Sequence, residues 1–133
     1  MKGETKMKKL IAILMCCFLL IGVFTGCTKS VDYPDVTVFE SELNKGADLT
    51  GKTVTFEVTG VRPASAFGYN LIGGEHLNFV NDKNPGAVYG DIVTVKVTEI
   101  SSMMGSWIID YKLIKVEQGP HSGEEEPTES EEY

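Results

Sequence analysis

The side chains that most often carry out catalysis are scarce in this chain of 133 residues, which has two histidines and three cysteines. His76 is the histidine whose surroundings suggest acid–base chemistry, because it follows Glu75, whereas His121 lies in a polar stretch near the C-terminus. Adjacent residues of a strand point to opposite faces of a sheet, so we expect Glu75 and His76 not to meet. The sequence therefore predicts no enzymatic activity and no catalytic residue.

Metal and phosphate chemistry are equally weakly indicated. A loop that begins at Asp82 would need an acid, a glycine and a glutamate at its fifth, sixth and twelfth positions to bind calcium. This chain has Gly86, Ala87 and Val93 there. The glycine pair at residues 73–74 lacks the lysine and helix that follow a phosphate-binding loop. We therefore expect no metal site and no cofactor.

The first 26 residues have the zones of an export signal. Four lysines precede residue 10, and residues 10–24 form an apolar run of 15 residues. A membrane-spanning helix needs about 20 apolar residues, whereas the core of a signal peptide needs roughly 7 to 15. The length favours a removable signal peptide over residues 1–26, with an uncleaved anchor helix as the alternative.

The run Phe24-Thr25-Gly26-Cys27 resembles the lipobox of bacterial lipoproteins, in which a bulky apolar residue and two small residues precede a cysteine. The resemblance implies cleavage after Gly26 and a diacylglyceryl group on Cys27, with palmitate as a typical acyl chain. Two acyl chains hold a protein stably on a membrane. We therefore expect Cys27 to be lipidated and the protein to face outward from the cell membrane, with a Gram-positive source suggested by the resemblance.

The rest of the chain is acidic. Removal of residues 1–26 takes away four lysines and one glutamate, which leaves 8 basic and 18 acidic side chains and a net charge of −10. Six glutamates fall in the last ten positions, and so polar a segment buries too little apolar surface to become ordered. We expect a tether over residues 27–35, one domain over residues 36–118 and a disordered acidic tail over residues 119–133.

The periodicity of the domain predicts a short helix and then strands. Thr37 as N-cap with Glu40 three residues later fits a capping box, and Gly46 is typical of a helix stop, so a helix over residues 38–45 is expected. Alternating apolar residues from residue 53 onward predict a half-buried strand that bends at the glycine at position 60.

The remaining alternation predicts four more strands. A Gly-Gly pair joins two of them in a hairpin, and a turn-rich connection and a further turn separate the others. These strands are expected over residues 69–72, 75–80, 93–98 and 107–117.

This strand order resembles an OB-fold, a small Greek-key barrel, over about residues 48–116. The glycine-bent first strand and the Gly90-Asp91-Ile92-Val93 entry into the fourth are similar to the anticodon-binding-like OB-folds, some of which occur in small lipoproteins of Gram-positive bacteria. The expected fold is all-β, an OB-fold-like barrel of five strands with a short N-terminal helix. An SH3-like barrel or an open β-sheet is the alternative.

The resemblance implies a binding or interaction module, because OB-folds bind ligands on the face of their second and third strands and on the bordering loops. The expected partner is a protein, a peptide or an envelope polymer, and the domain is expected to be a monomer. A surface-exposed nucleic-acid-binding module is the alternative. Phosphate contacts dominate nucleic-acid affinity, so 12 acidic against 8 basic residues over residues 28–123 argue against it. The candidate ligand-binding residues are Phe67, Tyr69, Asn70, His76, Asn78, Met103 and Met104.

Overall fold

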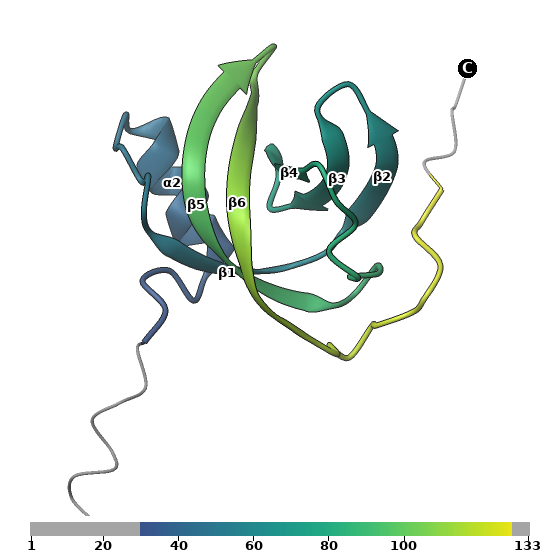
Figure 1. Ribbon diagram of the computed structural model, residues 1–133. Coiled ribbons are helices and arrows are strands. Elements are labelled where there is room, and N and C mark those ends of the chain that lie inside the picture. Colours follow the sequence, from purple (N-terminus) through teal and green to yellow (C-terminus); the bar gives the residue numbers. More distant parts are fainter. Residues whose placement is uncertain (1–29, 129–133) are drawn as a thin grey trace, which may run out of the picture. The chain divides into compact units, whose positions relative to one another are not determined.

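The structure is a computed structural model that describes residues 30–128, and this part of the chain is mostly β. One short helix, α2, comes first, and six strands follow it, as Figure 1 shows. The bounds are Val36–Asn44 for α2, Thr53–Glu57 for β1, Gly60–Ser65 for β2, Gly68–Gly73 for β3, Leu77–Asn81 for β4, Ile92–Met103 for β5 and Ser106–Glu117 for β6.

Asp35 is the N-cap of α2. Its Oδ1 accepts hydrogen bonds from the Thr37 hydroxyl at 2.6 Å and from the Thr37 amide at 2.9 Å, and these bonds hold the pKa of Asp35 below its ordinary value. The predicted capping box of Thr37 and Glu40 is therefore wrong, because Asp35 already supplies the acceptor for the first turn. The helix stops before Gly46, whose φ is +90°, as predicted.

Glu40 connects α2 to the turn between β3 and β4. The residue is only 7% exposed, and its carboxylate accepts hydrogen bonds from the backbone amides of Glu75 at 3.0 Å and His76 at 2.8 Å. The Nδ1 atom of His76 lies 3.3 Å from the same carboxylate. Because a charged acceptor satisfies two turn amides, the helix is anchored to the sheet by more than apolar packing.

The strands form one open sheet in the order β1-β5-β6-β4-β3-β2. Neighbours are antiparallel except β4 and β6, which are parallel. The strands β1 and β2 are the two edges, and no ladder joins them. The predicted five-stranded barrel is therefore wrong in strand number and in closure, as is the SH3-like barrel. The mostly-β class, the short N-terminal helix and the open-sheet alternative are confirmed.

The structure has six strands and not five because the strand predicted from residue 53 onward is divided into β1 and β2. The division falls where the backbone changes its hydrogen-bond partners. The Val58 amide donates to the Asp91 carbonyl at 2.9 Å, and the Gly90 amide donates to the Val58 carbonyl at 2.8 Å. The next amide, that of Thr59, donates instead to the Ile72 carbonyl at 2.8 Å. Val58 thus bonds to the residues before β5 and Thr59 bonds to β3, so one stretch of chain links the two edges of the sheet.

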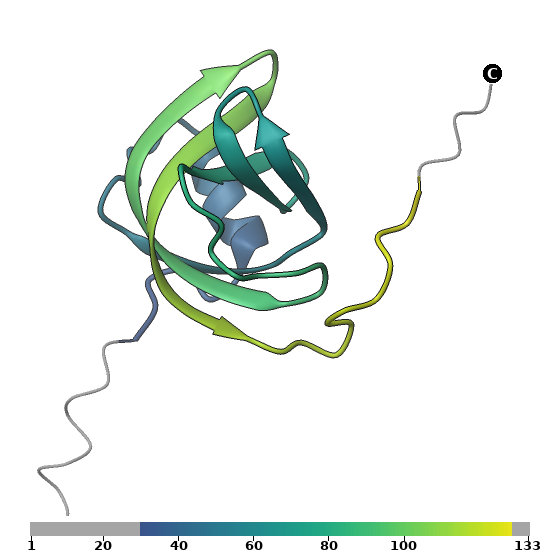
Figure 2. The same cartoon turned by 45° about the vertical axis from the view of Figure 1, so that its right-hand side comes forward.

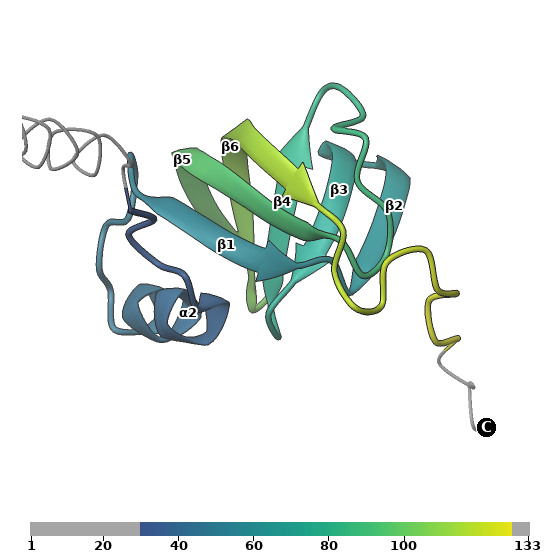
Figure 3. The ribbon, with the colours of Figure 1, turned by 90° about the horizontal axis from the view of Figure 1, so that it is seen from below.

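The inner face of the sheet carries the apolar core, and α2 lies against this core beside β1 (Figure 3). The rings of Phe56 and Phe79 stack with centroids 3.9 Å apart and planes 6° from parallel. A Cβ atom at position 73 would lie 2.7 Å from the Phe56 ring, so Gly73 lets the rings approach β3 closely. The largest fully buried side chains are Phe39, Phe56, Phe79, Leu43, Leu71, Leu77 and Ile109.

The C-terminal segment, residues 118–128, leaves β6 and passes towards β2 (Figures 1 and 2). The Gly123 amide donates to the Tyr89 carbonyl at 2.9 Å, and the Ser122 hydroxyl donates to the carboxylate of Asp91. The tail that was expected to be disordered from residue 119 therefore has specific contacts with the domain. Its last residues, 129–133, lie outside the described part of the chain.

The predicted signal peptide, residues 1–26, and the predicted lipidation site Cys27 also lie outside the described residues. Within residues 30–128, no helix combines the length and the apolar character that crossing a membrane requires.

We predict that Glu40→Ala lowers the free energy of unfolding by about 2–4 kcal/mol, because hydrogen bonds to a charged group contribute about 1.5–3 kcal/mol each. The matched control is Glu42→Ala in the same helix, which removes an exposed ion pair with Lys45 worth less than about 1 kcal/mol. Thermal unfolding followed by circular dichroism measures both variants. Equal melting temperatures for the two would contradict the role of Glu40.

Candidate functional site

The register of the sheet aligns side chains on the face that points away from the core, called here the outer face. Directly paired residues of neighbouring strands share a face. Arg62 pairs with Asn70, Asn70 with Val80, Val80 with Asp110, and Asp110 with Glu99. These residues therefore form one row from β2 to β5, with a cation at one end and two acids at the other.

A second row lies beside the first on the outer face. It runs from Ile72 through Asn78 and Ile108 to Ser101. Ile108 is 7% exposed and Val80 of the first row is 2% exposed, although neither belongs to the core cluster. In Figure 1 the β5–β6 hairpin and the β2–β3 hairpin stand on either side of β4. The burial of these outward side chains indicates that the middle of the outer face is shielded by its surroundings.

Two asparagines connect three strands across the outer face. The Nδ2 atom of Asn70 donates to Oδ1 of Asn78 at 2.9 Å, and the Nδ2 atom of Asn78 donates to the Trp107 carbonyl at 3.2 Å. Asn70 is 7% exposed, and within residues 30–128 its Oδ1 has no hydrogen-bond partner. A buried acceptor without a donor costs free energy. The outer face thus contains a fixed amide pair with one unused acceptor.

The β5–β6 side of the outer face is acidic. Partial burial raises the pKa of Asp110 above its ordinary value, and the negative charges of Glu99 and Asp82 raise it further. Among the described residues, none of these three carboxylates forms an ion pair with a lysine, arginine or histidine. This end of the face is therefore suited to a cationic group and unsuited to a phosphate.

Apolar side chains project from the two hairpin turns that border the face. Phe67, in the turn between β2 and β3, is 41% exposed. Met103 is 49% exposed and Met104 fully exposed at the turn between β5 and β6, where Met104 has a φ of +51°. Exposed apolar side chains beside a partly shielded polar face are typical of a binding surface.

The predicted ligand-binding residues do not all lie together. Asn70 and Asn78 share the outer face, and Phe67, Met103 and Met104 lie in the bordering turns. Tyr69 instead packs against the core.

His76 lies in the β3–β4 turn, where its ring is close to Glu40. The prediction that His76 and Glu75 do not meet is wrong, because both are in a turn rather than a strand and the His76 Nδ1 lies 3.9 Å from the Glu75 carboxylate.

Tyr111 is a second buried group with an unused polar atom, but it lies on the inner face. Its hydroxyl has no hydrogen-bond partner in the described part of the chain, and burial raises its pKa to about 12 against an opposing effect of the Asn81 side chain. The ring belongs to the core cluster. Tyr111 therefore serves packing and is not available to a ligand.

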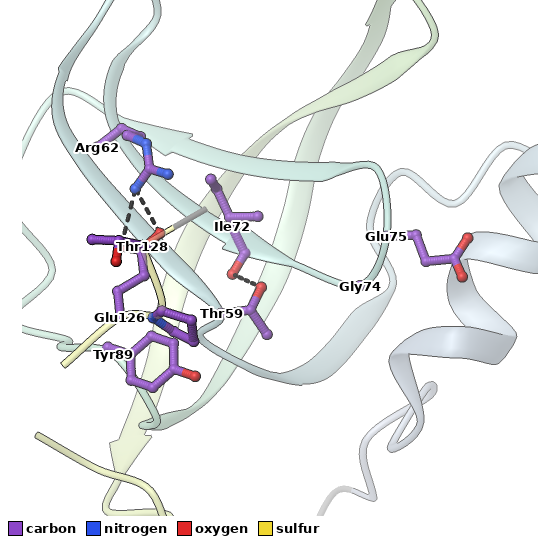
Figure 4. A pocket seen from close by; sticks show the side chains of 9 residues that line it. Thr59, Arg62, Ile72, Gly74, Glu75, Tyr89, Glu126 and Thr128 are labelled. Atoms are coloured by element: carbon purple, nitrogen blue, oxygen red, sulfur yellow. Dashed lines mark hydrogen bonds and ion pairs between the residues drawn. The ribbon is translucent and has the colours of Figure 1, made fainter. Parts of the chain in front are cut away.

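A pocket of about 680 Å³ lies at the β2–β3 side of the domain (Figure 4). Arg62 and Ile72 come to it from the sheet, Tyr89 from the connection before β5, and Glu126 from the C-terminal segment. Dashed lines in Figure 4 join Arg62 to Glu126, and another joins the Thr59 hydroxyl to the Ile72 carbonyl. One wall of this pocket is thus formed by the acidic end of the chain.

Sequence reasoning missed Arg62, Val80, Glu99, Ile108 and Asp110 as parts of the site. Their positions opposite one another follow from the parallel pairing of β4 with β6 and from an irregularity in the register between Val97 and Glu99. Two adjacent apolar residues in a strand, such as Ile108 and Ile109, place one apolar side chain on each face of the sheet. This pattern was the sequence signal for a partly buried outer face. Alternation alone does not indicate which strands become neighbours.

The outer face has amides, two acids and apolar borders, and no group of three or more histidine, cysteine, aspartate or glutamate side chains within residues 30–128 could hold a metal ion. Comparison with known proteins places the chain in no group, since no family model, no curated protein and no solved structure matches it.

Proposed function

We propose that this chain is a membrane-anchored extracytoplasmic lipoprotein whose domain binds a protein, a peptide or an envelope polymer and catalyses no reaction. The observation that carries the binding function is the outer face, where Asp110 and Glu99 are directly paired and neither forms an ion pair with a lysine, arginine or histidine among the described residues. A folded domain gains no stability from clustered like charges or from an unused buried acceptor. The clustered negative charges are explained when a ligand supplies the cation.

The finer fold assignment is part of this proposal: the domain is an OB-fold-like module in which the bent strand is divided into β1 and β2. The OB-fold is a partly open Greek-key barrel. In support, a single bent stretch bonds to the residues before β5 on one side and to β3 on the other. The asparagines and the two hairpin turns then correspond to the face and loops where OB-folds bind ligands.

The ligand that fits the outer face best is a peptide segment with a basic residue and apolar neighbours. A lysine or arginine of the peptide would form ion pairs with the carboxylates of Asp110 and Glu99. The apolar residues next to it in the peptide would contact Phe67 or Met103. A nucleic acid fits poorly, because phosphates would approach unpaired carboxylates.

The anchoring part of the proposal rests on the sequence. A basic start, an apolar run too short to span a membrane and Phe24-Thr25-Gly26-Cys27 at its end support a lipid on Cys27. Asp32 and Tyr33 hydrogen-bond to Thr53 of the domain. Of the predicted tether over residues 27–35, this leaves residues 27–31, which would reach at most roughly 17 Å at about 3.3 Å per residue. The binding domain would therefore act close to the membrane as a monomer.

We predict that the lipid is on Cys27. Mass spectrometry of the protein extracted from bacterial membranes should find a mature chain that begins at a modified Cys27, and Cys27→Ala should remain unprocessed or be released. An unmodified Cys27 in membrane-bound mature protein would refute the lipoprotein proposal.

Binding is tested with three labelled probes in fluorescence anisotropy: a 12-residue peptide of alternating lysine and leucine, its glutamate–leucine counterpart and a mixed-sequence 20-nucleotide single strand. The basic peptide should bind best. Its affinity should fall at least about fivefold in Asp110→Asn, since a charged contact contributes about 1 kcal/mol or more when partly buried. The loss should be smaller in Glu99→Gln, because the Glu99 side chain is exposed.

The control for the probe experiment is Glu42→Gln, which changes the net charge equally but lies on α2. It should bind the basic peptide as the unaltered protein does. If the single strand binds more tightly than the basic peptide at physiological salt, the nucleic-acid module becomes the better interpretation.

We also predict a stability gain when the charge of Asp110 is removed. Burial and the charges of Glu99 and Asp82 raise the pKa of Asp110 in the folded state, so its contribution to stability is fully present below its unfolded pKa and is lost as the pH rises through the folded value. Asp110→Asn should therefore raise the melting temperature at pH 7 and not at about pH 3. A lower melting temperature at pH 7 would contradict this prediction.

A further inference from the structure

The C-terminal segment contacts the edge strand β2 through the carboxylate of Glu126. Both oxygens of Glu126 accept from Nη1 of Arg62, at 2.9 and 3.0 Å, and Oε2 lies 3.4 Å from the Val61 amide nitrogen. A Cβ atom at position 60 would lie 2.9 Å from Oε1 of Glu126, so Gly60 leaves the room for this approach. A guanidinium, a backbone amide and a glycine thus surround one carboxylate.

The residues that hold the segment in place come before Glu126. Gly123 and Ser122 bond to Tyr89 and Asp91, and the next acid, Glu124, pairs with His121 of its own segment at 3.3 Å. These contacts bring the chain to β2. They leave Glu126 as the acid that contacts the sheet.

The carboxylate lies at the mouth of the pocket of about 680 Å³ shown in Figure 4. Arg62 is the only basic residue among the described residues that line it, and Ile72, Tyr89 and Pro127 supply apolar surface. Glu75 adds an acid to the lining. The pocket therefore offers one site for an anion, at Arg62, with apolar contacts around it.

We propose that Arg62, the Val61 amide and Gly60 form a carboxylate-binding site for an acidic peptide, and that Glu126 occupies this site as an intramolecular substitute for the ligand. The ion pair is open to solvent, with the Arg62 side chain 53% and the Glu126 side chain 30% exposed. Solvent-exposed pairs are weak. Glu126 therefore stays at Arg62 mainly because both belong to one chain and not because their ion pair is strong. An acidic peptide can displace it.

Glu126 belongs to the same chain as Arg62, and this determines how strongly it competes with a free peptide. A ligand on a short flexible linker has an effective concentration of about a millimolar, so a free peptide must compete with Glu126 at roughly that level. Removing the carboxylate of Glu126 empties the site without altering Arg62. Arg62 is the basic end of the outer-face row, but this inference does not depend on the acidic end that carries the proposed function. The outer-face experiment alters Asp110 and Glu99 and leaves Arg62 and Glu126 intact.

The test uses the full chain and a labelled free peptide with the sequence of residues 123–133, followed by fluorescence anisotropy. Glu126→Gln should bind the peptide at least about fivefold more tightly than the unaltered protein, because intramolecular competition is removed. Glu125→Gln is the matched control with the same change of charge, and it should bind as the unaltered protein does. Adding Arg62→Gln to Glu126→Gln should abolish binding.

Hydrogen exchange of the Val61 amide provides a second measurement that needs no added peptide. It should become faster in Glu126→Gln and stay unchanged in Glu125→Gln. Equal peptide affinity in Glu126→Gln and the unaltered protein, or peptide binding that survives Arg62→Gln, overturns the proposal. Circular dichroism checks that each variant is folded, which Arg62→Gln is expected to be because its side chain is exposed.

Discussion

The architecture depends on one link in the chain, the change of hydrogen-bond partners between Val58 and Thr59. Val58 bonds to the residues before β5 and Thr59 bonds to β3, although β5 and β3 are not neighbours in the sheet. Val58 and Thr59 are consecutive, so the residues before β5 and strand β3 must both lie within hydrogen-bond distance of this short link. The link also joins β1 to β2, the two edge strands of the open sheet. The sheet is forced to curve, so one face encloses the core and the other becomes the outer face.

The two faces then differ in how their polar groups are satisfied. On the core side, the buried carboxylate of Glu40 is matched by two backbone amides, and the aromatic rings of Phe56 and Phe79 stack. On the outer face, Asn70 keeps an acceptor without a donor and Asp110 lies near other acids. In the proposed function, groups that cost stability in the free protein serve recognition. This contrast is the physical basis of the proposed binding function.

Sequence periodicity predicted the strands and the bend because burial on one face imposes a period of two. The glycine at position 60 marked the bend, and the Gly-Gly pair marked the β3–β4 turn. The N-cap was misplaced because Asp35 and Thr37 both suit a helix start. Asn70 and Asn78 were reached through the OB-fold resemblance, whereas Asp110 and Arg62 were missed, because long-range pairing and the path of the C-terminal segment are tertiary properties.

The central claim, that the outer face is the recognition surface, is tested most directly by nuclear magnetic resonance of ¹⁵N-labelled protein titrated with the lysine–leucine peptide. The side-chain amide signals of Asn70 and Asn78 report on the face itself, since both amides bond within it. We predict that these signals and the backbone signals of Ile108 and Asp110 shift together and saturate. Shifts confined to α2 or to residues 118–128, with both asparagine side chains unchanged, would contradict the account.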